Sequence, residues 1–128
     1  NKTDRDLFLT KNTKKVIDLV GNTTMSQLSA LMGELDCVVS SDTAPLHVAS
    51  AMNTKTVCLF GPTDPRRHVP PAGSHIVLRR NLSCSPCYKE RCVEGHRCMR
   101  EISVDEVFAA VTKQLGTVSE KKNEKAAR

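Results

Sequence analysis

Hydrophobic and polar positions along the chain follow two periodicities, and this pattern predicts its elements. Short apolar or β-branched runs predict strands at residues 15–21, 37–40, 56–60 and 75–79. Apolar positions at helical spacing predict helices within residues 24–35, 45–52 and 103–111. Strands that alternate with amphipathic helices are typical of an open, mostly parallel sheet. The predicted fold class is therefore α/β.

The residues at the predicted helix starts support these boundaries. Thr24 stands three residues before Gln27, which is the spacing of a capping box. Pro45 fits the first turn of the second helix. Asp105 and Glu106 fit the first turn of the third, where acidic side chains are favoured by the helix dipole.

Two polar turns, residues 42–43 and 61–64, follow strands that we expect to be neighbours in the sheet. In a parallel sheet both turns lie beyond the carboxyl ends of the strands, where ligands bind. The first turn opens a helix, so backbone N–H groups and the positive end of the helix dipole face outward there. Such a helix start predicts a phosphate-binding site.

Three residues of this helix start are candidates to contact a ligand. The hydroxyl of Thr43 and the N–H groups of Thr43 and Ala44 could hold a diphosphate, whereas the alternative is that Thr43 is an ordinary N-cap. His47, one turn later, could donate to a phosphate when protonated or to a sugar oxygen when neutral. The alternative for His47 is a structural histidine whose hydrogen bonds are satisfied within the fold.

The composition favours a single soluble domain. The chain has 128 residues, of which 39% are hydrophobic and 26% charged. It has no apolar run of membrane-spanning length, and residues 1–6 are too polar for a signal peptide, which favours a cytosolic protein or a soluble piece of a larger one. Aromatic residues make up only 3%, which argues against stacking platforms for single-stranded nucleic acid.

Positive charge gathers in two segments of the chain. Residues 79–100 carry six Lys or Arg against two Glu, and residues 119–128 carry four against two. Such segments either bind nucleic acid or an acidic surface, or they are simply solvated. We expect residues 116–128 to form a basic, disordered tail.

A cysteine loop at residues 81–100 carries a further candidate site. Its four cysteines have the spacing Cys-x2-Cys-x4-Cys-x5-Cys and are Cys84, Cys87, Cys92 and Cys98. They suit structural zinc, but an iron–sulfur cluster or two disulfides would use the same residues. Cys37 and Cys58 lie in strand runs and are predicted to be packing residues.

The same loop supports an alternative function, a metal-containing nucleic-acid or protein interaction domain. Its basic residues, such as Lys89 and Arg91, would then face phosphates. This interpretation is disfavoured because the loop lacks a second zinc knuckle and an obvious reading helix. It also leaves the predicted sheet unexplained.

Several of these motifs together resemble one known family. They are residues 19–24 before a helix, Asp-Thr-x-Pro-x-His at 42–47, Phe-Gly-Pro-Thr-Asp-Pro at 60–65 and the downstream cysteine loop. In this order and spacing they resemble the carboxyl-terminal half of glycosyltransferase family 9, the heptosyltransferases of lipopolysaccharide core synthesis, over about residues 4–115. The family usually has Gly where this chain has Ala44, which alters the closest approach of a phosphate to the backbone.

The resemblance implies a GT-B enzyme with two Rossmann-like domains. Residues 1–115 would belong to the domain that holds a nucleotide-sugar donor, typically ADP-heptose. The diphosphate would lie on Thr43 and Ala44, with Asp42 and His47 close to the phosphates and the sugar.

The donor's base and ribose would have their own contacts by the same resemblance. Thr23 and Thr24 would border the base, and Asp4 would hold the ribose hydroxyls. The chemistry requires fixed dipoles and a cation at the departing diphosphate, and we expect no catalytic metal.

The resemblance further implies that this chain acts with a second domain. The general base and the lipopolysaccharide core acceptor would come through an amino-terminal domain that is absent here. No catalytic residue is then assigned within the chain, apart from His47 as a stabiliser of the donor phosphate, and the chain alone is expected to bind donor weakly and transfer nothing. We expect a bacterial cytoplasmic location at the inner face of the inner membrane, and homo-oligomers formed through an unpaired sheet edge.

Overall fold

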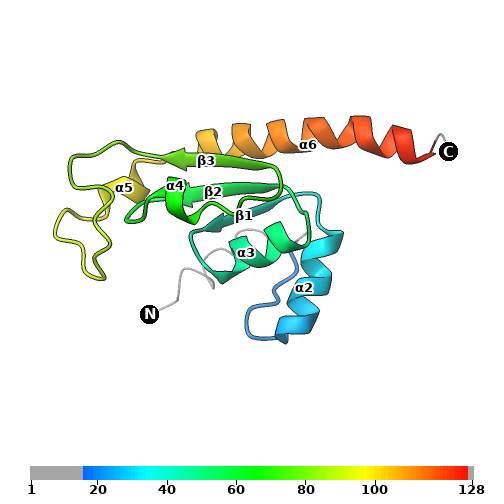
Figure 1. Cartoon of the computed structure of the whole chain (residues 1–128), viewed down its shortest axis with the longest axis horizontal. Helices are drawn as coiled ribbons and strands as arrows, with labels where there is room; N and C mark the ends of the chain where they lie inside the picture. The colour runs from blue at the N-terminus through cyan, green and yellow to red at the C-terminus, as the bar shows by residue number, and fades with distance from the viewer. Residues whose placement is uncertain (1–15, 127–128) are drawn as a thin grey trace.

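The computed structural model describes the backbone of residues 16–126 and the side chains of residues 16–116. The elements in chain order are α2 (Met25–Glu34), β1 (Val38–Ser41), α3 (Ala44–Ala51), β2 (Thr56–Phe60), α4 (Pro65–His68), β3 (His75–Arg79), α5 (Arg97–Arg100) and α6 (Val104–Ala126) (Figure 1). The described strands form one three-stranded sheet in the order β1-β2-β3. Both pairings are parallel. The predicted α/β class is confirmed.

The register of the sheet brings the strand ends together. Val38 pairs with Thr56, and Thr56 pairs in turn with His75, so the three strands start side by side. Because all three run in the same direction, the turns that follow β1 and β2 lie at one edge of the sheet. This is the edge where the sequence predicts a ligand site.

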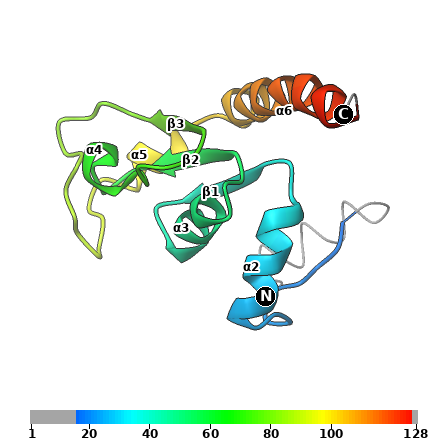
Figure 2. The ribbon, with the colours of Figure 1, turned by 45° about the vertical axis from the view of Figure 1, so that its right-hand side comes forward.

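The face of the sheet that α3 covers is densely packed. Leu46 of α3 and Cys58 and Phe60 of β2 are at most 1% exposed, and Val69 and Val77 pack against them. Cys58 is therefore the core residue that the sequence predicts. Figures 1 and 2 show α3 on one side of the sheet and α6 on the other. This packing fixes α3 and hence the turn that precedes it.

The helix α2 begins at the predicted capping box. The Gln27 N–H donates to Thr24 Oγ1 at 3.3 Å, and Gln27 Oε1 accepts from the Thr24 N–H at 2.9 Å. The helix attaches to the sheet through a small cluster of Met32, Val38 and Ala49. Both reciprocal bonds of the box are present, so the sequence signal located this helix start correctly.

On the opposite face, α6 lies over β2 and β3 and is held there by polar contacts. The buried Gln114 donates from Nε2 to the carbonyls of Thr56 and Ser74 at 2.9 and 3.1 Å. Glu106 in the first turn forms an ion pair with Arg80. This pair, with hydrogen bonds from Ser103, holds the pKa of Glu106 at about 2.

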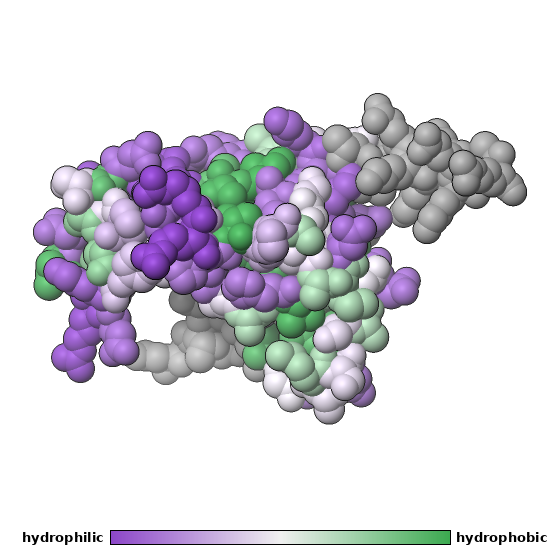
Figure 3. All heavy atoms as spheres, viewed as in Figure 1, coloured by the Kyte–Doolittle hydropathy of each residue, from purple (hydrophilic) through white to green (hydrophobic). Residues whose placement is uncertain are grey.

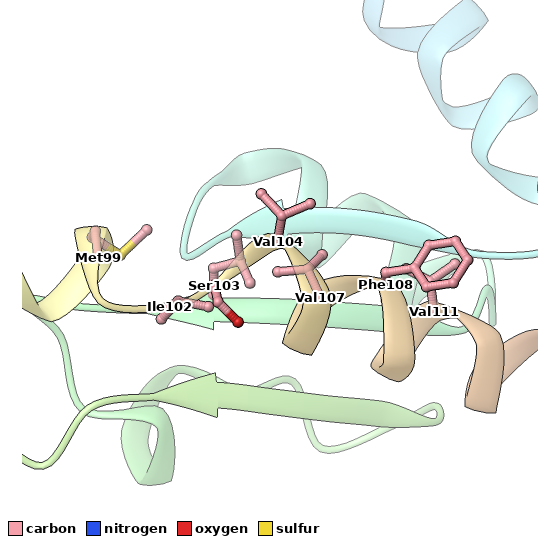
Figure 4. A pocket seen from close by; sticks show the side chains of 8 residues that line it. Met99, Ile102, Ser103, Val104, Val107, Phe108 and Val111 are labelled. Atoms are coloured by element: carbon pink, nitrogen blue, oxygen red, sulfur yellow. The ribbon is translucent and has the colours of Figure 1, made fainter.

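The groove beside α6 is apolar and only partly covered. A cavity of about 360 Å³ is lined by Leu59 and by side chains from the stretch 99–111, which Figure 4 shows pointing over the strands. Phe108 is 72% exposed, and Val39 of β1 is 46% exposed on the same face. In the face drawn in Figure 3, hydrophobic surface lies over the strands next to the strongly hydrophilic surface of α4. None of the described helices combines the length and the apolar composition needed to cross a bilayer.

The strand predicted at residues 15–21 is wrong for the part that the structure describes. Residues 16–21 form no strand, and the Asn22 N–H donates to the Leu19 carbonyl in a turn in which Gly21 has a φ of +75°. Ile17 and Val20 are 82% and 66% exposed. A β-branched run becomes a strand only beside a partner strand, and no described strand pairs with this segment. The next strand begins at Val38, one residue later than predicted.

The last helix runs further than the sequence pattern indicates. The helix expected within residues 103–111 is α6, whose backbone continues through Ala126, and the disorder expected for residues 116–128 stays a prediction. The segment is rich in Lys, Glu and Ala, which have high helix propensity, and it extends a helix already started by residues 104–115. Composition alone does not distinguish a solvated helix from a disordered segment.

Candidate functional site

The turn between β1 and α3 leaves the start of the helix open. Thr43 is the N-cap, with an extended backbone at φ −147° and ψ 171°, but its side chain makes no capping hydrogen bond. Its hydroxyl instead donates to the Ser41 carbonyl at 3.3 Å and lies 3.3 Å from Ser40 Oγ. Thr43 and Ala44 are both exposed. Among the described residues, the first N–H groups of α3 therefore have no side-chain cap at Thr43.

The residues that follow limit how this helix start can be satisfied. Pro45 has no N–H group, and the Leu46 N–H donates to the Thr43 carbonyl at 3.0 Å. The first turn of α3 thus offers the N–H groups of Thr43 and Ala44 and the positive end of the helix dipole. This arrangement suits an anion at the predicted position.

A carboxylate between two histidines forms the wall of this turn. Asp42 Oδ1 lies 3.8 Å from His47 Nε2, and Asp42 Oδ2 lies 3.4 Å from His68 Nδ1. The Asp42 side chain is only 12% exposed, whereas those of His47 and His68 are 53% and 38% exposed. Asp42 is placed to orient both imidazoles, and each imidazole adds positive charge beside the helix start when it is protonated.

His68 is a site residue that the sequence analysis missed. It comes from α4, which follows β2, so it reaches Asp42 only because the ends of β1 and β2 are neighbours. The sequence offered one signal: His68 comes three residues after the turn at 61–65, which follows the strand predicted at 56–60. A histidine in a short Pro-Arg-Arg-His segment carries no pattern that selects it over a solvated residue.

The turn after β2 is closed by its own side chains. Asp64 Oδ1 accepts from the Arg66 N–H at 3.0 Å, and Asp64 Oδ2 pairs with Arg66 Nη2 at 2.7 Å. The hydrogen bonds from Arg66 hold the pKa of Asp64 at about 2. The Asp64 N–H donates to Tyr88 Oη at 3.2 Å, and the ring of Tyr88 lies 5.8 Å from that of His68.

One polar atom of this second turn lacks a partner. Thr63 Oγ1 is buried and has no hydrogen bond among the described residues. A buried hydroxyl without a partner is costly, so this atom has the capacity to bind a ligand or a water at the strand edge. Thr63 is thus a second polar group at this edge that the sequence analysis did not single out.

The predicted contacts to the base and ribose are not joined to this cluster. The Thr24 side chain is used in the capping box of α2. Within residues 16–116, no hydrogen bond or ion pair links Thr23 or Thr24 to the turn at 42–47. Asp4 lies outside the described residues.

The four cysteines of the loop at 81–100 lie around one small cavity. Cys84, Cys87, Cys92 and Cys98 line a space of about 40 Å³ together with Lys89, Arg91 and Arg97. Burial raises the pKa of the Cys98 thiol, and the other three thiols raise it further. All four are free thiols. Within the described residues, however, no three His, Cys, Asp or Glu side chains are arranged to hold a metal ion.

The basic residues of the cysteine loop are partly used inside the molecule. Arg97 Nε pairs with Glu101 Oε1 at 2.7 Å. Arg80 pairs with Glu106 and also donates from Nε to the Glu101 carbonyl at 3.0 Å. Guanidinium groups engaged in this way are less available to phosphates of a nucleic acid, which weakens the alternative function.

Comparisons with known proteins indicate the family of the chain. Residues 4–97 match the family described as Glycosyltransferase family 9 (heptosyltransferase). A lipooligosaccharide heptosyltransferase 2 from Campylobacter jejuni is 29% identical over 101 residues, which cover 77% of this chain and 32% of that protein. A lipooligosaccharide heptosyltransferase 2 from Haemophilus ducreyi is 30% identical over 104 residues, covering 77% and 30%.

A third relative matches over a shorter stretch. A lipopolysaccharide heptosyltransferase 1 from Pseudomonas aeruginosa is 37% identical over 62 residues, covering 48% of this chain and 17% of that protein. No solved structure gives a significant match. The chain spans about a third of the length of the first two relatives. Because the family match extends over most of its length, this chain belongs to glycosyltransferase family 9, the heptosyltransferases.

Proposed function

We propose that this chain is the donor-binding part of a lipopolysaccharide heptosyltransferase. In this proposal it holds a nucleotide sugar of the ADP-heptose type with the diphosphate at the start of α3. The observation that carries the proposal is the open turn at Thr43 and Ala44, next to the Asp42 carboxylate between His47 and His68. Family membership supplies the reaction class.

Each group of the turn has a role in this proposal. The N–H groups of Thr43 and Ala44 bind the diphosphate oxygens, and the Thr43 hydroxyl adds a third donor by turning from the Ser41 carbonyl to the ligand. As the bond to the sugar breaks, negative charge grows on the departing diphosphate, and fixed N–H dipoles stabilise it without reorganising. His47 and His68 contribute charge or hydrogen bonds at the same place.

Asp42 is a positioning residue in this scheme. A carboxylate next to a diphosphate would repel it, but Asp42 is largely buried and lies against the two imidazoles. It holds both rings at the mouth of the turn. The side chains that face the donor are therefore those of the histidines.

The acceptor side of the reaction belongs to the rest of a longer protein. We propose that the lipopolysaccharide inner core and the general base that activates its hydroxyl are brought by a part outside this chain, in the bacterial cytoplasm. This is consistent with a chain that spans about a third of its relatives. Alone, the chain should bind donor weakly and transfer nothing, because half of the cleft is missing.

Calorimetric titration of the 128-residue chain with ADP and with an ADP-sugar tests the proposal. Thr43→Val removes the hydroxyl but keeps the size of the side chain, and we expect it to weaken ADP binding about 3- to 10-fold, the value of one hydrogen bond. Thr112→Val is the matched control, since Thr112 lies on α6 and its hydroxyl donates to the Phe108 carbonyl. It should leave ADP affinity unchanged.

Two outcomes would contradict the proposal. One is a folded chain that binds neither ADP nor an ADP-sugar at millimolar concentrations. The other is ADP binding that is insensitive to both Thr43→Val and His47→Ala. Binding of short duplex DNA with a steep salt dependence, without nucleotide binding, would favour the interaction-domain alternative.

A further inference from the structure

The loop between β3 and α5 is long and lacks regular structure, so interactions other than those of a helix or strand must hold it in place. Residues 80–96 contain no helix or strand. Its larger apolar side chains contribute little burial, since Val93 is 84% exposed and Tyr88 is 49% exposed. Irregular loops of this length are uncommon in compact domains unless they are functional or fastened by a specific device.

The side chains of the four cysteines in this loop converge on one place. They come from two short stretches, 84–87 and 92–98, and they line the same cavity of about 40 Å³. Cys98 is buried at the start of α5, where its sulfur lies close to Gly61 at the end of β2. The His96 N–H donates to Cys92 Sγ at 3.2 Å, which holds this sulfur in place within the loop.

We propose that Cys84, Cys87, Cys92 and Cys98 bind one Zn²⁺ ion as a structural centre. Four thiolates at these spacings form a closed tetrahedral site, and each thiol gives up its proton to solvent as it binds. In the structure, no three of these side chains are yet arranged around an ion. Binding therefore requires the exposed Cys84 and its neighbours to close on Cys98, which is already anchored in the core.

Charge favours zinc over two disulfides, which the same four cysteines could form. A zinc ion with four thiolates carries a net charge of about −2. Of the charged side chains in the lining, Glu94 is acidic and Arg97 is paired with Glu101. Lys89 and Arg91 remain to offset part of the charge of the zinc centre. Two neutral disulfides would gain nothing from these cations.

The centre would also brace the wall of the donor site, an extension that depends on the proposed function. The N–H groups of Cys87 and Tyr88 both donate to the Pro62 carbonyl at 2.9 Å, and Ser85 Oγ donates to the Gly61 carbonyl at 2.6 Å. Tyr88 in turn lies against His68, which faces Asp42. The ion would thus fix the strand-end turn and the position of His68.

Metal analysis of the 128-residue chain, purified under reducing conditions without added metal, tests the zinc centre directly. We expect elemental mass spectrometry to find one zinc ion per chain. When Co²⁺ replaces the zinc, we expect the absorption spectrum of cobalt bound tetrahedrally by thiolates. Cys92→Ser and Cys98→Ser should each lose the ion. Cys37→Ser, which changes a thiol outside the loop, should retain it. The cobalt spectrum of the unmodified chain remains decisive if the variants fail to fold.

Several results would overturn the proposal. They are a reduced chain that neither contains zinc nor binds added Zn²⁺ or Co²⁺, bound iron with sulfide, and zinc that survives both Cys92→Ser and Cys98→Ser. Two disulfides among the four cysteines in freshly isolated chain would overturn it as well.

The metal and donor proposals fail in distinguishable ways. If the chain contains one equivalent of zinc but never binds ADP, the zinc centre is supported and the donor site is contradicted. If the chain binds ADP but cannot bind zinc, the donor site is supported and the zinc centre is contradicted. If both stand, removal of the ion with a chelator should weaken ADP binding by at least 3-fold, and unchanged ADP affinity would remove the bracing role.

Discussion

The turns after β1 and β2 lie at the same edge of the sheet and each opens a helix, yet one is open and the other is closed. Thr43 makes no capping bond, and Thr43 and Ala44 are both exposed. Asp64 caps its helix through the Arg66 N–H and pairs with the Arg66 guanidinium. At the closed turn Asp64 has satisfied the helix start, although the neighbouring Thr63 Oγ1 has no partner among the described residues, whereas the open turn keeps its N–H donors for something else.

This difference separates stability from function along one edge of the sheet. A capped helix start with an internal ion pair stabilises the fold and has little left to offer a ligand. An uncapped start gives up that stabilisation and retains N–H groups and dipole for an anion. Changes at the closed turn should therefore alter unfolding, and changes at the open turn should alter binding. The following predictions test this division.

The largest effect is expected from the core beneath the open turn. Leu46 is fully buried against Cys58 and Phe60, so Leu46→Ala should lower the free energy of unfolding by about 2–5 kcal/mol. Urea denaturation measures this. Val39→Ala on the other face is the control, because Val39 is 46% exposed and should cost less than about 1 kcal/mol. Equal losses would mean that α3 is not anchored as described.

The closed turn should account for part of the acid sensitivity of the fold. Arg66 lowers the pKa of Asp64 from its ordinary value of 3.8 to about 2, so the unfolded chain takes up the proton first as the pH falls. The stabilisation is therefore complete above about pH 4 and is lost between about pH 4 and pH 2. Asp64→Asn keeps a capping oxygen but removes the charge.

Denaturation of wild type and Asp64→Asn across this pH range measures the contribution. The difference in unfolding free energy should be greatest above pH 4 and vanish near pH 2, and it should be smaller than the effect of Leu46→Ala. Arg66→Ala should give the same pH profile, and combining the two changes should add little, since both remove one pair. A difference that grows as the pH falls would contradict this interpretation.

His68 comes from α4 but faces Asp42 of the open turn, so His68→Ala should weaken binding of ADP rather than the fold. We expect a loss of affinity of about 3- to 10-fold by calorimetry, with a change in unfolding free energy below about 0.5 kcal/mol, because the His68 side chain is partly exposed. Arg67→Ala removes a full charge from the same short helix and is the matched comparison. If Arg67→Ala weakens ADP binding more than His68→Ala, long-range charge and not the imidazole position explains the effect.

The elements around the site were predictable because their signals are local. The apolar run before Asp42, Pro45 in the first helical turn and the second apolar run place β1, α3 and β2 within a residue or two. The strand predicted at 15–21 is wrong for residues 16–21, because a strand depends on a partner, which a local pattern does not contain, and no described strand pairs with this segment. Likewise, the sequence suggested Asp42 and His47 but not His68, because pairing of β1 with β2 brings His68 to Asp42.

The smallest effect, and the finest test of the open turn, is expected from Ala44→Gly. Ala44 is the first residue of α3 and is exposed, and glycine there costs at most about 1 kcal/mol of stability. Losing the methyl group lets a phosphate approach the backbone more closely, so ADP affinity should rise by no more than about 3-fold. Ala51→Gly at the other end of α3 should cost similar stability without changing affinity. Weaker ADP binding in Ala44→Gly alone would mean that the methyl group contacts the ligand, and that the diphosphate does not lie on the amides of this turn.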